Sequence, residues 1–153
     1  MTSSTDRIEK EILLKVTRVW VWWALSVAEE FGKWFGVALN GQAFAAGQRV
    51  RGPITHCGHE NVMFDALIVE MKPGRLLSYR WHPYAVDAAI DYSKEETTLV
   101  VMELSDAEGG TLLKVVESGF DKVPATRRLE AFRMNSGGWE AQLQNVARHV
   151  ATP

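Results

Sequence analysis

The sequence predicts an α+β domain in which one long C-terminal helix packs against an antiparallel sheet. Near the C-terminus, apolar or small residues recur at alternating steps of four and three, which places them on one face of a helix. They are Ala125, Leu129, Phe132, Ser136, Trp139, Leu143, Val146 and Val150. Most of the preceding segments have the composition and alternation of strands. A long amphipathic helix needs an apolar surface to cover, so either a packed core or a pocket is expected between helix and sheet.

The bounds of this helix are predicted at Pro124 and Val150. Proline is tolerated at the first position of a helix, and the positive charge of Arg148 and His149 suits a helix C-terminus.

The other elements follow in chain order. Ile8–Val16 is expected to be a strand, Thr17 to cap a helix that runs to about Ser26, and Ala28–Phe35 to be a second short helix that ends at Gly36. A loop is expected at Gly41–Gly47. The later strands are predicted at Arg49–Thr55, Asn61–Met71, Leu76–His82, Thr97–Leu104 and Thr111–Ser118, the last two as a hairpin across Ala107–Gly110. Between the third and fourth of these strands, Ala85–Glu96 is a polar excursion.

Composition limits the class of protein. A length of 153 residues suits a single domain over 1–153, with residues 1–7 as a flexible tail. A net charge of −2 argues against nucleic-acid binding, and no apolar run approaches the roughly 20 residues of a membrane span. The single cysteine, Cys57, excludes an internal disulfide, and the polar start of the chain is unlike a signal peptide. We therefore expect a cytoplasmic protein.

Several short segments resemble one known family. They are Val21-Trp22-Trp23-Ala24-Leu25-Ser26, Glu30-Phe31-Gly32-Lys33-Trp34-Phe35, Leu77-Ser78-Tyr79-Arg80-Trp81, Gly110-Thr111-Leu112-Leu113, Glu117-Ser118-Gly119-Phe120 and Asn135-x-Gly137-Gly138-Trp139. From Ile8 to Val150 the chain resembles the heat-shock-protein ATPase activator-like family of the START-like superfamily, which includes lipid carriers and polyketide cyclases. The resemblance implies a helix-grip fold, a curved antiparallel sheet wrapped around the C-terminal helix, often with a cavity.

The chain departs from the family pattern at two places. The family usually has Ala-Pro and polar residues where Val16–Trp20 stands, and a polar residue where Trp23 stands. His56-Cys57-Gly58 replaces a turn in which proline is common.

A cavity between the sheet and the long helix is the first candidate site. Alternation places Tyr79 and Trp81 on one strand face, and Glu117 at the end of another apolar row. A desolvated carboxylate there would serve as a base or a ligand anchor, whereas pairing with an arginine or capping of backbone groups at the strand end is the alternative. The predicted lining is Tyr79, Trp81, Glu117, Phe132, Ser136 and Trp139. Two glycines, Gly137 and Gly138, weaken the helix beside Ser136, so close backbone approach or room for a ligand is expected there. A solid aromatic core is the alternative.

A second candidate cluster contains His56, Cys57 and His59. A zinc site or an activated thiol needs further positioned partners, and His82 is the nearest additional imidazole. We predict a surface turn instead, with no metal, no cofactor and no catalytic role for Cys57.

The third candidate is the first helix. Val19, Trp20, Trp23 and Val27 form an apolar stripe opposite the core-facing Val21, Trp22 and Leu25. The stripe predicts a homodimer interface, because exposed tryptophans are typical of binding surfaces. Coverage by the Asn40–Gly47 loop, a role as pocket lid and a redesigned surface are alternatives.

The function expected from these features is binding of a small apolar molecule, or chaperone-related binding by family resemblance. An enzyme is not favoured, because no base–nucleophile pair or metal set emerges from the sequence. A cyclase- or hydrolase-type enzyme in the same cavity and a self-associating interaction protein remain alternatives.

Overall fold

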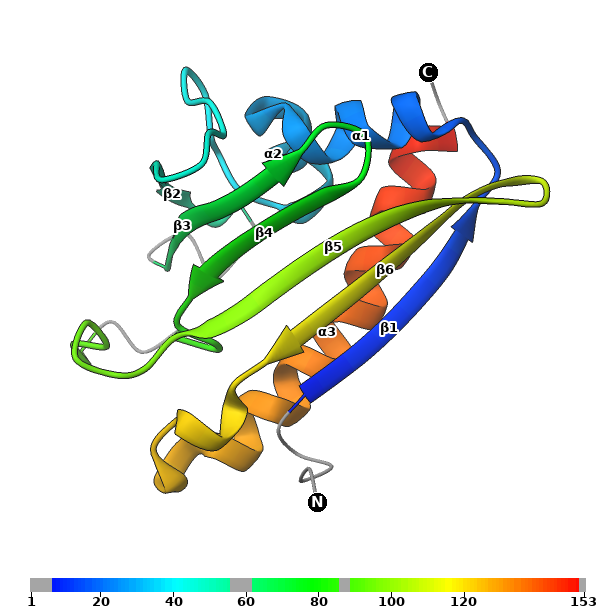
Figure 1. Cartoon of the computed structure of the whole chain (residues 1–153). Helices are drawn as coiled ribbons and strands as arrows, with labels where there is room; N and C mark the ends of the chain where they lie inside the picture. Colours follow the sequence, from blue (N-terminus) through cyan, green and yellow to red (C-terminus); the bar gives the residue numbers. More distant parts are fainter. Residues whose placement is uncertain (1–6, 56–61, 86–88, 152–153) are drawn as a thin grey trace.

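The computed structural model describes residues 7–55, 62–85 and 89–151. In this part of the chain six antiparallel strands form one sheet in the order β1-β6-β5-β4-β3-β2, which curves around the long helix α3 (Figure 1). The elements are β1 (Arg7–Leu14), α1 (Arg18–Ser26), α2 (Ala28–Phe35), β2 (Arg49–Pro53), β3 (Met63–Lys72), β4 (Leu76–Trp81), β5 (Thr98–Ala107), β6 (Gly110–Ser118), the 3-10 turn η1 (Phe120–Lys122) and α3 (Ala125–Ala151). The predicted α+β helix-grip fold is confirmed.

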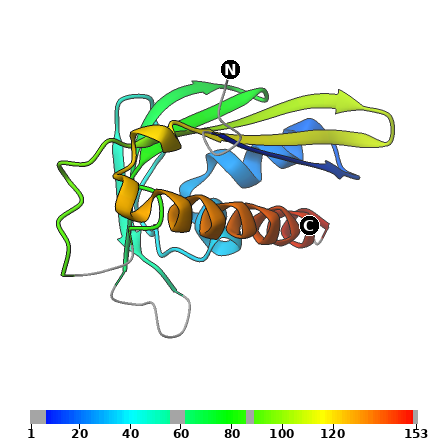
Figure 2. The same ribbon diagram turned by 90° about the horizontal axis from the view of Figure 1, so that it is seen from below.

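The molecule has two layers, with the sheet on one side and α3 on the other (Figure 2). The short helices α1 and α2 contact the C-terminal half of α3. The indole nitrogen of Trp20 donates to the carbonyl of Val150, and the side-chain amide of Gln142 donates to the carbonyl of Phe35. These contacts close one end of the sheet's concave side.

Most element boundaries lie within three residues of the predicted ones, and the differences have local causes. Thr17 occupies the N-cap position of α1, but its side chain makes no capping hydrogen bond; its carbonyl accepts from the first turn instead. Gly36 ends α2 in the left-handed conformation with φ 95°, as predicted. Arg7, placed in the predicted tail, is the first residue of β1.

The apolar stripe of α3 is buried only along part of the helix. Trp139, Leu143, Val146 and Val150 lie in the core, whereas Leu129 is exposed. The stripe therefore contacts the sheet only beyond the first turns of α3.

The adjacent glycines of α3 do not face the sheet. Both Gly137 and Gly138 are exposed, and a methyl group added to either would meet no described atom within 4 Å apart from the adjacent residues and the local backbone of α3. The expected close approach of the sheet to these glycines is therefore absent among the described residues.

None of the described helices is long and apolar enough to cross a bilayer.

Candidate functional site

A cavity of about 900 Å³ opens between the β2–β3–β4 end of the sheet, the β4–β5 loop and α3. Its apolar lining is Phe35, Ile54, Val62, Met63, Phe64, Trp81, Tyr84, Ala85 and Ile90. Its polar lining is Arg49, Arg51, Asp65, His82, Asp91, Tyr92, Ser93 and Asn135. An apolar pocket of this size with a few polar groups is typical of a small-molecule site.

Three aromatic rings form the packed part of the wall. Phe35, Phe64 and Trp81 come from α2, β3 and β4, and their ring centroids lie 5.3 to 6.0 Å apart in edge-to-face arrangements. Phe64 and Phe35 are buried and so are held by the core on their far side. Since edge-to-face packing fixes ring orientation, the wall is preformed.

The predicted lining residues divide between this wall and the core behind it. Trp81 lines this cavity. Tyr79 and Trp139 are buried behind it, while Phe132 is half-buried and packs edge-to-face on Phe120, 5.3 Å away. Half-buried Ser136 is not among the lining residues found in the described part of the chain.

Sequence reasoning missed three lining residues that carry the site. Phe64 belongs to the buried alternation Phe64, Ala66, Ile68 of β3, which marks a core-facing row. Phe35 and Asn135 lie within the segments that resemble the family, and this resemblance was the one indication in the sequence that they could belong to a site. Alternation shows which residues face the core, but it does not show which of them lie at the opening of a cavity.

Glu117 is fully buried beneath this wall. Its carboxylate accepts from Trp139 Nε1 (2.7 Å), Trp81 Nε1 (2.7 Å), Thr98 Oγ1 (2.6 Å) and Asn135 Nδ2 (3.0 and 3.1 Å). The side chain points inward, between β4 and α3. The alternative pairing with an arginine is not what the structure shows, because the carboxylate is held by four neutral donors. Such a complete set of donors offsets the desolvation of a buried carboxylate.

Two of these donors separate Glu117 from the cavity. Trp81 and Asn135 both line the cavity, whereas Glu117 does not. A ligand in the cavity would therefore meet the donors of Glu117 rather than its carboxylate.

The charged groups at the cavity rim are already engaged. Asp65 on β3 pairs with Arg49 (2.7 Å) and Arg51 (3.3 Å) of the edge strand β2. On the opposite rim, hydrogen bonds from Ser93 hold the pKa of Asp91 below its usual range. The described lining thus consists of an apolar wall and of acidic groups that already have ion-pair or hydrogen-bond partners.

Arg127 of α3 fastens the loop that covers one side of the cavity. Its guanidinium bonds the carboxylate of Glu95 at 2.7 and 2.8 Å, donates to the carbonyl of Pro83 at 2.8 Å and lies 4.8 Å from the ring centre of Tyr92. Tyr84 in this loop has φ 49°, a conformation that costs energy for a residue with a side chain. The loop is therefore held against α3 by several bonds from one residue.

The predicted interface on α1 is partly occupied by contacts within the chain. Trp20 and Trp23 stack at 4.5 Å between ring centroids, and Trp23 stacks on His149 of α3 at 5.9 Å. The C-terminal end of α3, rather than the Asn40–Gly47 loop, contacts these two tryptophans. Neither tryptophan lines the cavity. Val19 is 80% exposed and Val27 is 40% exposed. Self-association through this stripe stays a prediction.

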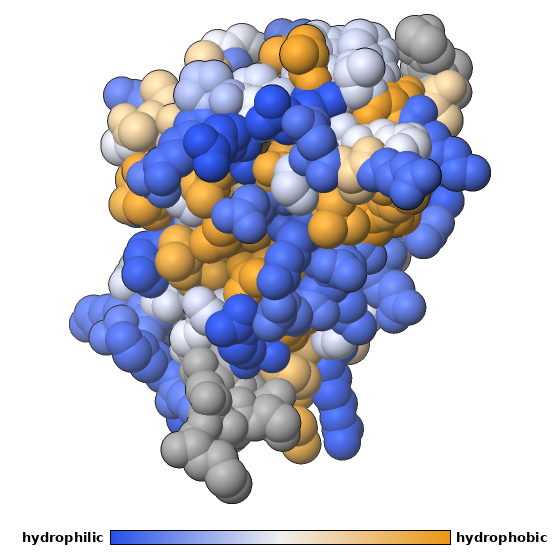
Figure 3. Space-filling view, turned by 45° about the vertical axis from the view of Figure 1, so that its right-hand side comes forward, coloured by the Kyte–Doolittle hydropathy of each residue, from blue (hydrophilic) through white to orange (hydrophobic). Residues whose placement is uncertain are grey.

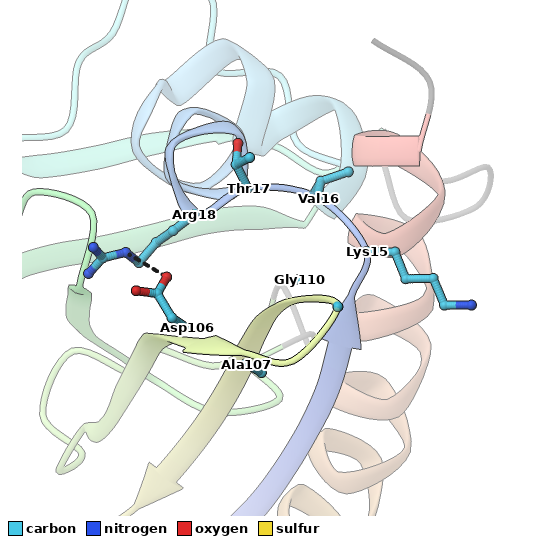
Figure 4. Close-up of a pocket in the computed structure, with 8 residues that line it drawn as sticks. Lys15, Val16, Thr17, Arg18, Asp106, Ala107 and Gly110 are labelled. Atoms are coloured by element: carbon cyan, nitrogen blue, oxygen red, sulfur yellow. Dashed lines mark ion pairs between the residues drawn. The ribbon is translucent and has the colours of Figure 1, made fainter.

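A second hollow, of about 470 Å³, lies between the β1–α1 connection and the β5–β6 turn (Figure 4). Arg18 and Asp106 face each other across it, 3.4 Å apart, and Lys15 points away from them (Figure 4). Because its one facing charge pair is satisfied internally and it lacks an aromatic wall, this hollow is the weaker candidate.

The metal prediction concerns residues outside the described ranges. His56, Cys57 and His59 fall in 56–61, so their role as a surface turn stays a prediction. Within the described ranges, no group of three or more histidine, cysteine, aspartate or glutamate side chains is placed to hold a metal ion.

Comparison with solved structures supports the same fold. The protein MLL2253 from Mesorhizobium loti is 21% identical, with a TM-score of 0.72 over 95% of this chain and 96% of that one. A solution structure of a protein from Arthrobacter aurescens is 10% identical, with a TM-score of 0.76 over 100% of this chain and 90% of that one. DynU16, a putative protein in the dynemicin biosynthetic locus, is 18% identical, with a TM-score of 0.71 over 96% of this chain.

This chain spans about half of DynU16, 48% of its length. No curated protein sequence matches the chain. The profile of the family described as "Activator of Hsp90 ATPase homolog 1-like protein" matches residues 15–151, nearly the whole chain. The chain therefore belongs to the Activator of Hsp90 ATPase homolog 1-like protein family.

Proposed function

We propose that this protein binds a small, predominantly apolar molecule in the cavity between the β2–β3–β4 end of the sheet and α3. The observation that carries the proposal is the preformed aromatic wall of Phe35, Phe64 and Trp81 at a cavity of about 900 Å³. An apolar ligand gains roughly 25 cal/mol for each Å² of apolar surface that it removes from water. A rigid wall adds to affinity because little side-chain entropy is lost on binding.

Binding is favoured over catalysis by the state of the acidic groups. Asp65 is paired with two arginines, Asp91 is bonded by Ser93, and Glu117 lies behind Trp81 and Asn135. A general base must reach the proton that it abstracts, and these carboxylates are already engaged in ion pairs or hydrogen bonds within the protein. A cyclase- or hydrolase-type enzyme in the same cavity remains the alternative. Chaperone-related binding rests on the family relationship alone.

The first test is native mass spectrometry of freshly purified protein, which reports bound ligand and oligomeric state together. A small molecule that co-purifies and is recovered unaltered after incubation supports a binding protein. Recovery of a chemically altered molecule would instead support the enzyme.

The second test locates the ligand with a matched pair of variants. Met63 lines the cavity and is 46% exposed, while Met134 on α3 is 50% exposed and is not part of the described lining. Met63→Arg should weaken binding of the apolar dye Nile red by about tenfold or more, because a charge must be desolvated to admit the dye. Met134→Arg should leave the affinity within about twofold. Equal effects of the two substitutions would contradict the proposed site.

A further inference from the structure

Asn135 links the buried carboxylate to the cavity. Its side chain lines the cavity, and its amide nitrogen donates to both oxygens of Glu117. A carboxamide presents a donor on one side and an acceptor on the other, so its orientation decides what the cavity offers to a ligand.

The neighbours of Glu117 fix that orientation. An indole nitrogen is a donor only, and Trp139 and Trp81 donate to different oxygens of Glu117, Oε1 and Oε2. Both carboxylate oxygens are therefore acceptors. If the carboxamide of Asn135 were turned over, its carbonyl oxygen would face these acceptors at about 3 Å, which is repulsive. The amide nitrogen must point to Glu117.

The carbonyl oxygen of Asn135 consequently points away from Glu117. No side chain or backbone group among the described residues donates a hydrogen bond to this oxygen, and the oxygen is not completely buried. Asn135 thus offers the cavity a hydrogen-bond acceptor, Oδ1, and the hydrogen bonds of its amide nitrogen to Glu117 fix the direction of this acceptor.

We infer that the ligand carries a hydroxyl or N–H group that donates to Oδ1 of Asn135, and that Glu117 acts as a positioning residue for this contact. The inference rests on the proposed function and specifies the chemistry of the ligand: an apolar body with a hydrogen-bond donor rather than a purely hydrocarbon or acceptor-only molecule. The aromatic wall would hold the body, and Asn135 would select the donor.

Two probes that differ at one group test this selection. The pair is 1-hydroxypyrene, which can donate, and 1-methoxypyrene, which cannot; both affinities are measured by calorimetry on the full chain. The wild type should bind 1-hydroxypyrene about fivefold to tenfold more tightly, the value of one hydrogen bond. Asn135→Leu, of similar size, should abolish this preference while retaining binding of 1-methoxypyrene.

The positioning role has a signature that a merely structural role would not produce. In Glu117→Gln the new amide group can donate, so Asn135 can turn its carbonyl inward and present its own N–H to the cavity. The preference for 1-hydroxypyrene should then be lost although Asn135 is still present, because the oxygens of both probes can accept from that N–H. If Glu117→Gln does not fold, as judged by circular dichroism, the comparison of wild type with Asn135→Leu still decides the ligand contact.

The outcomes separate the inference from the proposed function. Equal affinity of the wild type for both probes, or an unchanged preference in Asn135→Leu, overturns the inference and leaves cavity binding intact. Binding of neither probe contradicts the proposed function, and the inference fails with it.

Discussion

The indole nitrogen of Trp139 on α3 donates a 2.7 Å hydrogen bond to the buried carboxylate of Glu117 on β6. The same carboxylate accepts from Trp81 on β4, and the two indole rings lie 5.9 Å apart. One acidic side chain therefore bridges the helix and the concave face of the sheet beside the cavity.

Replacing Glu117 by glutamine should destabilise the protein although the shape is retained. Glutamine offers one acceptor oxygen where two indole donors need one each, so a buried N–H loses its partner. We expect the free energy of unfolding to fall by about 1–3 kcal/mol, measured by urea denaturation. Thr98→Val, which removes a hydroxyl donor but leaves both indoles bonded, should cost less. A larger loss in Thr98→Val than in Glu117→Gln would contradict this assignment.

Tyr79→Phe should be neutral or stabilising near neutral pH. The Tyr79 hydroxyl is buried and has no hydrogen-bond partner among the described residues, so removing it relieves a desolvation cost of about 1 kcal/mol or more. Thermal unfolding at pH 7 measures the effect. A clear loss of stability would show that the hydroxyl is satisfied in solution.

The same residue predicts a pH dependence. Burial, and then the charge of Glu117, raise the pKa of Tyr79 well above its usual value of 10.0. Above pH 10 the unfolded chain releases this proton while the folded chain retains it, so stability falls as pH rises. Tyr79→Phe should therefore show a shallower loss of stability between pH 10 and 11. An identical slope in both proteins would contradict the raised pKa.

Alanine at either exposed glycine of α3 should stabilise the protein. Gly137→Ala and Gly138→Ala add a methyl group that meets no described atom within 4 Å and reduce the entropy of the unfolded chain. Each should raise the free energy of unfolding by about 0.5–1 kcal/mol. Gly32→Ala is the matched control, because its Cβ would lie 2.3 Å from the Val37 carbonyl oxygen and should destabilise. Destabilisation by both α3 substitutions would reveal a contact outside the described residues.

The Arg127–Glu95 pair should be strongly coupled. Both side chains are largely buried, 16% and 19% exposed, and Arg127 also bonds the loop backbone. A double-mutant cycle with alanine should give a coupling energy of about 1–2 kcal/mol. The exposed pair Lys114–Glu9, at the same 2.7 Å, is the control and should couple more weakly because water screens it. Equal coupling in the two cycles would argue against a fastened loop.

Self-association through α1 is best tested at the valines. Trp20 and Trp23 contact α3, so charging them would disturb the fold, whereas Val19 and Val27 are exposed. If the wild type is dimeric at micromolar concentration, Val19→Glu with Val27→Glu should make it monomeric in sedimentation. On the side shown in Figure 3, apolar surface occurs in patches separated by hydrophilic residues. A wild type that is already monomeric would refute the predicted interface.

Local patterns in the sequence were sufficient for the elements and for the direction of single side chains. The steps of Trp139, Leu143, Val146 and Val150 predicted the buried face of α3, and alternation predicted that Glu117 points inward. The same periodicity put Phe132 among the expected lining residues, whereas in the structure its ring packs on Phe120, because periodicity identifies a helix face but not where along the helix a cavity opens.

The partners of Glu117 could not be predicted because they come from three separate elements. Trp81, Thr98 and Asn135 are brought together by the β4–β5 register and by the position of α3, neither of which a local pattern encodes. For the same reason, Phe35 was recognised as apolar but not as part of the cavity wall.

The sheet order also has a consequence for biosynthesis. Strand β1 is made first but pairs only with β6, with Ile12 opposite Leu113, roughly 100 residues later. At about 5–20 residues per second, β1 waits on the order of 5–20 s on the ribosome without its partner. Charged side chains disfavour pairing of an open strand with other chains, and β1 carries four of them, Arg7, Glu9, Lys10 and Glu11. Slowing translation before β6 should therefore lengthen the period in which the nascent chain depends on these charges.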